Sequence, residues 1–165
     1  MVLRRMPPLS GMPVRIESAS ALHDLRDRYG PVHAGSFLRE RRIAFDCTRA
    51  EFPRIFVHEV AHFAWLRLGN GRRWSFEEVL RAELARGAAG ELGWSAEWRK
   101  DALSAADVGA RTRRWREYCC ESFCDTAAWQ YSGVRRHDEF TLGPARRHER
   151  RQWFSRNLGR RTLSI

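Results

Sequence analysis

Apolar residues crowd the stretch from Phe52 to Leu68, and they fall on every side of a helical turn rather than on one stripe. A helix that is apolar all round is typical of a protein interior. Pro53 suits the first turn of such a helix, and Gly69 suits the position just after its last turn. The pattern therefore predicts a buried central helix from about Pro53 to Leu68.

The rest of the pattern predicts a mostly helical α+β fold. Alternating apolar and polar residues indicate strands between Val32 and Asp46, just before the central helix. Helical periodicity with start and stop signals predicts further helices at residues 20–29, 75–86, 95–103, 110–131 and 144–158. The start signal of the second of these is a capping box at Ser75. A last short strand is predicted at residues 140–142.

Length and composition favour one domain over residues 1–165. A chain of 165 residues that is 43% apolar can bury a single sizeable core. We expect a small β-sheet packed beside the central helix, and a flexible segment over residues 1–13. No apolar run approaches the roughly 20 residues that a membrane span requires, so no membrane partner is expected.

The central helix carries the pattern His-Glu-x-x-His at His58, Glu59 and His62. Residues four apart lie one turn apart on the same face, so both imidazoles can bind one divalent metal ion. Glu59 lies near that face and can act as general base on a metal-bound water. Polar groups in a buried helix are costly without a partner. The alternative is a hydrogen-bonded pair of core histidines with Glu59 in an ion pair.

A catalytic zinc site usually has three protein ligands, and a second helix offers the third. Glu121 and Asp125 are the only acids in a largely apolar stretch, and their spacing places them on one face. We expect Glu121 to bind the metal and Asp125 to accept the remaining N–H of a ligating histidine. The alternative is a solvated stripe in which both acids pair with Arg113 or Arg114.

The cysteines offer another metal site. Cys120 and Cys124 are four residues apart in the same predicted helix and could bind zinc as thiolates, which would give a closed, structural site. Three of the four cysteines are bunched at residues 119, 120 and 124, a spacing that does not suit a disulfide framework. We therefore expect a reduced, cytoplasmic protein.

With both segments in view, the chain resembles the zincin metallopeptidases that use glutamate as the third ligand, and more narrowly the ImmA/IrrE family. His58 to His62 match the first motif of that family, and Glu121 with Asp125 match the Glu and Asn of its Glu-x-x-Ala-Asn-x-Phe-Ala motif. Cys124 stands where the family has Ala, and Asp125 where it has Asn. The resemblance covers about half the chain.

This resemblance implies a zincin-like fold and a Zn²⁺-dependent peptidase with Glu59 as general base. It implies a peptide or protein substrate, such as a regulatory protein, that lies along a sheet edge formed by residues 43–46. The group that stabilises the oxyanion is left open. Its candidates by position after the second site helix are Tyr131, His137, Arg135 and Arg136.

The net charge of +10 comes almost entirely from arginine, and it is dense in the predicted basic helix over residues 144–161. This segment could be a nucleic-acid surface or an amphipathic helix that docks Trp153, Phe154 and Leu158 on the core. The docking interpretation is favoured, with weak, non-specific nucleic-acid binding expected from charge alone. The alternative function is a non-catalytic, metal-stabilised binding module with an arginine-rich surface.

Overall fold

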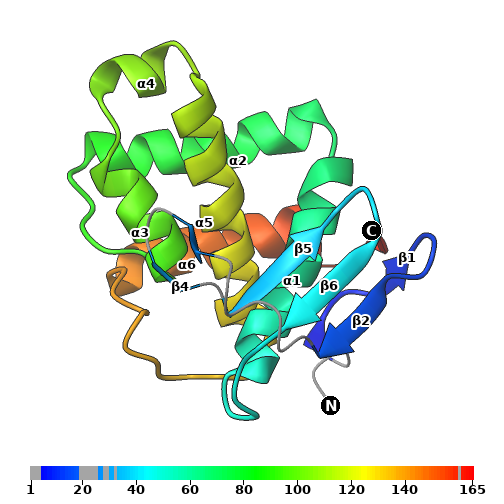
Figure 1. The fold of residues 1–165 in the computed structure, drawn as a ribbon. Coiled ribbons are helices and arrows are strands. Elements are labelled where there is room, and N and C mark those ends of the chain that lie inside the picture. The colour runs from blue at the N-terminus through cyan, green and yellow to red at the C-terminus, as the bar shows by residue number, and fades with distance from the viewer. Residues whose placement is uncertain (1–4, 19–25, 28–29, 32, 160) are drawn as a thin grey trace.

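The computed structural model describes residues 5–18, 26–27, 30–31, 33–159 and 161–165. It is a mostly helical α+β fold with a small sheet, as predicted (Figure 1). In these ranges the helices are α1 Phe52–Arg67, α2 Asn70–Ala85, α3 Trp94–Asp101, α4 Ala105–Gly109, α5 Arg113–Tyr131 and α6 Pro144–Asn157. The strands are β1 Leu9–Ser10, β2 Arg15–Ser18, β3 Arg26–Asp27, β4 Gly30–Pro31, β5 Ala34–Phe37, β6 Arg42–Phe45 and β7 Leu163–Ser164.

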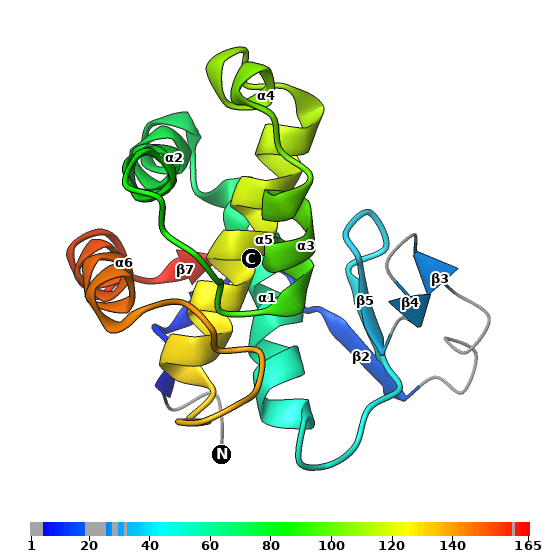
Figure 2. The ribbon, with the colours of Figure 1, turned by 90° about the vertical axis from the view of Figure 1, so that its left-hand side faces the viewer.

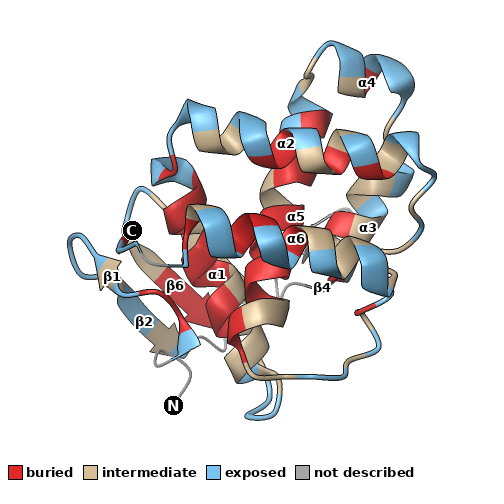
Figure 3. Cartoon of the chain, turned by 180° about the vertical axis from the view of Figure 1, so that it is seen from behind, coloured by how far each residue is buried: buried red, intermediate tan, exposed pale blue. Residues whose placement is uncertain are grey.

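Helices α1 and α5 pack together at the centre of the molecule. Figure 2 shows them between the sheet on one side and α2 and α6 on the other. They run antiparallel, because His58 lies opposite Asp125 whereas His62, one turn further along α1, lies opposite Cys120. Eight of the sixteen residues of α1 are buried and three are exposed, which confirms the prediction of a buried central helix (Figure 3).

Aromatic side chains fill the space between α5, α2 and α6. Phe123 of α5 stacks on Phe154 of α6 with ring centroids 5.1 Å apart, and both rings contact Phe76 of α2. Trp153 and Leu158 are also buried. The carboxy-terminal helix is therefore docked on the core through the residues that its amphipathic pattern predicted.

The main sheet has three strands in the order β2-β6-β5. Strand β6 pairs with β2 in parallel and with β5 antiparallel, and Ser36 of β5 lies opposite Ile43 of β6. Residues 43–46 were expected to form the sheet edge, and this is wrong because both sides of β6 are paired. In the described part of the chain the edge beside α1 is β5.

Part of the amino-terminal segment that was expected to be flexible, residues 1–13, pairs with the carboxy-terminal end of the chain. Strand β1 pairs in parallel with β7 near the opposite end of the chain, and Met6 is buried. A partner more than a hundred residues away leaves no local signal in the sequence. Residues 1–4 lie outside the described residues.

Other local elements also differ from their predicted positions. Helix α2 begins at Asn70, directly after Gly69 with its φ of 79°, so the predicted capping box at Ser75 lies inside the helix. Residues 140–142 form no strand. The helix predicted at residues 20–29 lies largely outside the described residues, but residues 26–27 pair with residues 30–31 as strands. No described helix is long and apolar enough to cross a membrane.

Candidate metal centre

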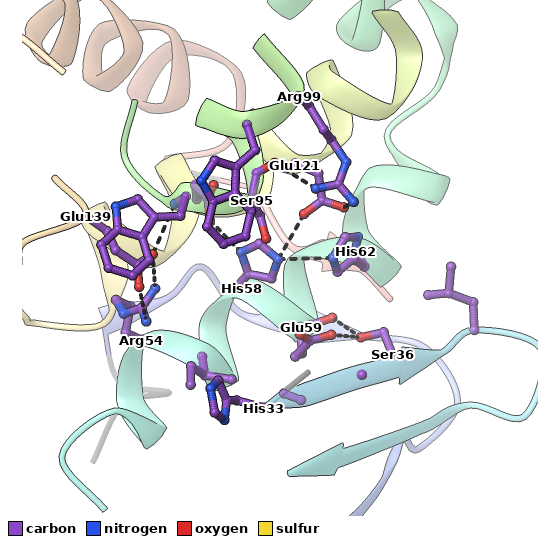
Figure 4. Close-up of a pocket in the computed structure, with 17 residues that line it drawn as sticks. His33, Ser36, Arg54, His58, Glu59, His62, Ser95, Arg99, Glu121 and Glu139 are labelled. Atoms are coloured by element: carbon purple, nitrogen blue, oxygen red, sulfur yellow. Dashed lines mark hydrogen bonds and ion pairs between the residues drawn. The ribbon is translucent and has the colours of Figure 1, made fainter. Parts of the chain in front are cut away.

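His58 and His62 direct one nitrogen each toward a common point. Their Nε2 atoms are 3.2 Å apart, and the rings meet nearly edge-on at an interplanar angle of 73° (Figure 4). Two nitrogens bound to one tetrahedral zinc at about 2.0–2.1 Å would lie roughly 3.3 Å apart. The histidine pair therefore has the separation that a shared metal ion requires.

Glu121 offers a further ligand atom beside His58. Its Oε2 lies 3.3 Å from His58 Nε2, again close to the separation of two ligands on one zinc. Burial opposes ionisation of this carboxyl, but the charges of His62 and His58 and a hydrogen bond from His58 outweigh it and lower the pKa of Glu121 to about 2. The alternative solvated stripe is not formed, since the side chains of Glu121 and Asp125 are only 15% and 3% exposed and both lie against His58.

Asp125 holds His58 from the other side of the ring. His58 Nδ1 donates to Asp125 Oδ1 at 2.7 Å, which leaves Nε2 facing Glu121 and His62. The other carboxylate oxygen of Asp125 accepts the backbone N–H of Ala96 at 3.2 Å, at the start of α3. Asp125 is therefore placed as the histidine partner that the spacing predicted.

The electrostatic field around the imidazoles of His58 and His62 favours positive charge there. Burial disfavours charged His62, but nearby Cys120 and Glu121 outweigh it and raise the pKa of His62 to about 9. Burial likewise opposes charge on His58, but Asp125 and Glu121 raise its pKa well above the usual value. A divalent metal ion placed between the two Nε2 atoms would satisfy the same field.

The cysteines form a second potential ligand set on the same histidines. Ligand atoms of His58, His62 and Cys124 all lie within 4.8 Å of one another. Cys120 Sγ is 3.5 Å from His62 Nδ1, the nitrogen turned away from His58. Burial raises the pKa of the Cys124 thiol well above its usual value. Glu121 lines the adjacent cavity and Cys124 does not, so of these two candidate ligands the carboxylate is the one that faces the open side.

Glu59 lies beside the three candidate ligands and is held by the sheet edge. Ser36 Oγ, on β5, donates to Glu59 Oε2 at 2.6 Å and lies 2.9 Å from the Glu59 carbonyl oxygen (Figure 4). Sequence reasoning missed Ser36. Its position in a predicted strand was visible, but nothing local showed which face of the strand meets α1.

All of these groups except the cysteines line one open cavity of about 450 Å³. The walls come from β5, α1, α3 and α5. Helix α3 contributes four residues that sequence reasoning missed: Trp94, Ser95, Trp98 and Arg99. The guanidinium of Arg99 lies 3.7 Å from Glu121 Oε1.

The predicted candidates for oxyanion stabilisation lie elsewhere. Tyr131 is buried against Phe154, and this burial raises its pKa to about 12. His137 Nε2 lies 3.2 Å from Glu51 Oε1. Neither residue lines the cavity, and neither Arg135 nor Arg136 does so. Position in the chain after α5 therefore does not by itself place a side chain at the candidate metal centre.

No protein-family model, curated protein or solved structure matches the chain. Its function is therefore inferred from the residues of this site and their geometry.

Proposed function

We propose that this protein is a zinc-dependent peptidase with a zincin-like site, in which His58, His62 and Glu121 hold the metal. One observation carries the proposal: His58 Nε2 lies 3.2 Å from His62 Nε2 and 3.3 Å from Glu121 Oε2, at the wall of an open cavity that also contains the Glu59 carboxylate. Two imidazoles and one carboxylate are a donor set of catalytic zinc. The metal supplies Lewis-acid activation of water and of the peptide carbonyl.

Glu59 moves the proton in this proposal. It accepts a proton from the attacking water and passes it to the leaving amine nitrogen as the peptide bond breaks. The hydrogen bond from Ser36 fixes the orientation of the carboxylate by holding Oε2. Asp125 keeps His58 in the tautomer whose Nε2 can bind the metal.

The substrate is an extended peptide segment that pairs with β5. Ala34, Gly35 and Ser36 of this edge strand line the cavity, and an added strand would gain main-chain hydrogen bonds there. This replaces residues 43–46 as the substrate-binding edge. A regulatory protein remains the proposed kind of target, in the reducing cytoplasm.

Metal analysis tests the ligand set. We expect about one zinc per chain in the wild type and in Cys124→Ser. His58→Ala, His62→Ala and Glu121→Ala should each lose most of it, because each removes one of three ligands. Circular dichroism of each variant checks that the fold is kept. Retention of zinc in Glu121→Ala, with loss in Cys124→Ser, would move the site to the thiol and favour a closed, non-catalytic centre.

Glu59→Gln tests the reaction. This variant should keep its zinc, because no ligand changes, and lose hydrolysis by at least about 10²-fold, the usual contribution of a positioned proton-transfer group. The measurement uses a random library of internally quenched peptides, with zinc content determined on the same samples. Full activity of Glu59→Gln would rule out this mechanism.

A further inference from the structure

The cavity wall opposite the sheet edge carries two exposed tryptophans. Trp94 and Trp98 stand one turn apart on α3 with ring centroids 6.1 Å apart and an interplanar angle of 26°. Their exposed fractions are 45% and 40%, although an indole is among the side chains that gain most from burial. Both line the same cavity as His58 and Glu59.

The start of α3 is anchored from two sides, so this aromatic wall is built in advance of any ligand. The backbone N–H of Trp94 donates to Glu139 Oε2 at 3.2 Å, and Glu139 is bound by Arg54 of α1. The backbone N–H of Ala96 donates to Asp125 of α5. A rigid wall loses little entropy when a ligand binds.

The charges around the wall favour a neutral ligand. Arg54 and Arg99 line the cavity beside the indoles, and a metal ion would add further positive charge. Of the acids that line the cavity, Glu139 is already paired with Arg54 at 2.9 Å, and Glu121 and Asp125 lie against His58. A cationic side chain would therefore be repelled, although indole faces attract cations in other settings.

The opposite wall has small side chains. Ala34, Gly35 and Ser36 line the cavity on β5, which leaves room for the side chains of a peptide paired with this strand. Successive side chains of such a peptide point to opposite faces. Every second side chain can then point to the same side of the peptide.

We propose that Trp94 and Trp98 form a specificity subsite that takes a large, neutral aromatic or aliphatic side chain of a peptide bound along β5. The proposal rests on the peptidase function and names its substrate class: segments with a residue such as Phe or Leu close to the scissile bond. One such side chain in an apolar subsite typically changes selectivity by about 10–200-fold.

The first experiment measures kcat/KM on internally quenched octapeptide libraries that differ in one fixed residue, in turn Phe, Leu, Ala, Lys and Glu. The wild type should prefer the Phe and Leu libraries over the Ala library by at least about 10-fold. Trp94→Ala and Trp98→Ala should lose most of this preference while keeping zinc. Trp98→Phe should retain the preference. Trp74→Ala is the matched control, because Trp74 is equally exposed but lies outside this cavity.

The second experiment measures binding without cleavage. Zinc-loaded Glu59→Gln should bind a fluorescein-labelled Phe library more tightly than the Ala library by fluorescence anisotropy, and Trp98→Ala in the same background should abolish the difference. Binding with this preference but no hydrolysis by the wild type would keep the subsite and overturn the peptidase. Hydrolysis without a tryptophan-dependent preference would overturn the subsite alone.

Two further outcomes would overturn the proposal. A preference for the Lys library that depends on Trp94 and Trp98 would make the wall a cation site. Absence of both binding and hydrolysis would remove the subsite together with the function on which it rests.

Discussion

Gly93 shows how one residue without a side chain shapes the candidate metal centre. A Cβ at this position would overlap the carboxyl group of Asp125, the group that orients His58. The φ of Gly93 is −178°, which any residue adopts, so the requirement is for space and not for backbone freedom. The start of α3 can approach Asp125 only because residue 93 is glycine.

We expect Gly93→Ala to weaken zinc binding by about 10–100-fold, the usual effect of losing the partner of a ligating histidine. Competition with a fluorescent zinc chelator measures this affinity. Gly109→Ala is the matched control, since a Cβ at Gly109 meets nothing within 4 Å. Wild-type affinity in Gly93→Ala would show that Asp125 does not position the ligand.

At the scale of elements, a buried ion network joins α6 to α2 and to the segment before α3. The Arg150 side chain is fully buried and binds Glu83 and Glu91, each at 2.6 Å. Burial raises the pKa of Glu83. It also opposes ionisation of Glu91, but Arg150 and a hydrogen bond from Tyr118 outweigh it and lower that pKa. Two carboxylates thus share one guanidinium.

Arg150→Met should lower the free energy of unfolding by about 3–5 kcal/mol, because it leaves buried Glu83 without its cation and buried Glu91 with Lys100 alone. Urea denaturation measures the change. Arg156→Met, at an exposed position on the same helix, should change stability by less than about 1 kcal/mol. Equal stability of the two variants would contradict a structural role for the network.

At the scale of the whole molecule, the net charge of +10 attracts any polyanion. Helix α6 does not form a separate basic arm, because its own side chains Arg150, Trp153 and Phe154 are buried in the protein. Removing this helix would expose the core, so truncation cannot test nucleic-acid binding. Charge substitutions at exposed positions can test nucleic-acid binding without disturbing the core.

We expect weak binding to a generic DNA duplex that falls steeply with salt and shows no sequence preference. Electrophoretic mobility shifts across a salt series measure it. The pair Arg151→Gln and Arg156→Gln on α6 should weaken binding no more than the pair Arg39→Gln and Arg113→Gln elsewhere on the surface. Tight binding that survives moderate salt, without any peptidase activity, would favour the binding module.

The amino-acid sequence by itself determined the two site helices and the residues on them that meet. The spacing of His58 and His62 and that of Glu121 and Asp125 lie within single helices, where 3.6 residues per turn decide which side chains share a face. Their apolar surroundings showed that α1 is buried. Residue spacing within a helix and the polarity of neighbouring residues are both short-range properties, so a continuous stretch of sequence is enough to predict them.

Tertiary structure alone decided which strand is the edge, which arginine is buried and what surrounds the candidate metal centre. Strand pairing placed β6 in the middle and β5 at the cavity, although both have strand patterns of similar length. In the sequence, Arg150 cannot be distinguished from the other arginines of the basic segment. Its partners Glu91 and Glu83 lie 59 and 67 residues away. Likewise Ser36 and Trp98 reach the cavity only through packing of β5 and α3 against other elements. Contacts between distant segments depend on how those segments pack, and local spacing does not encode that packing.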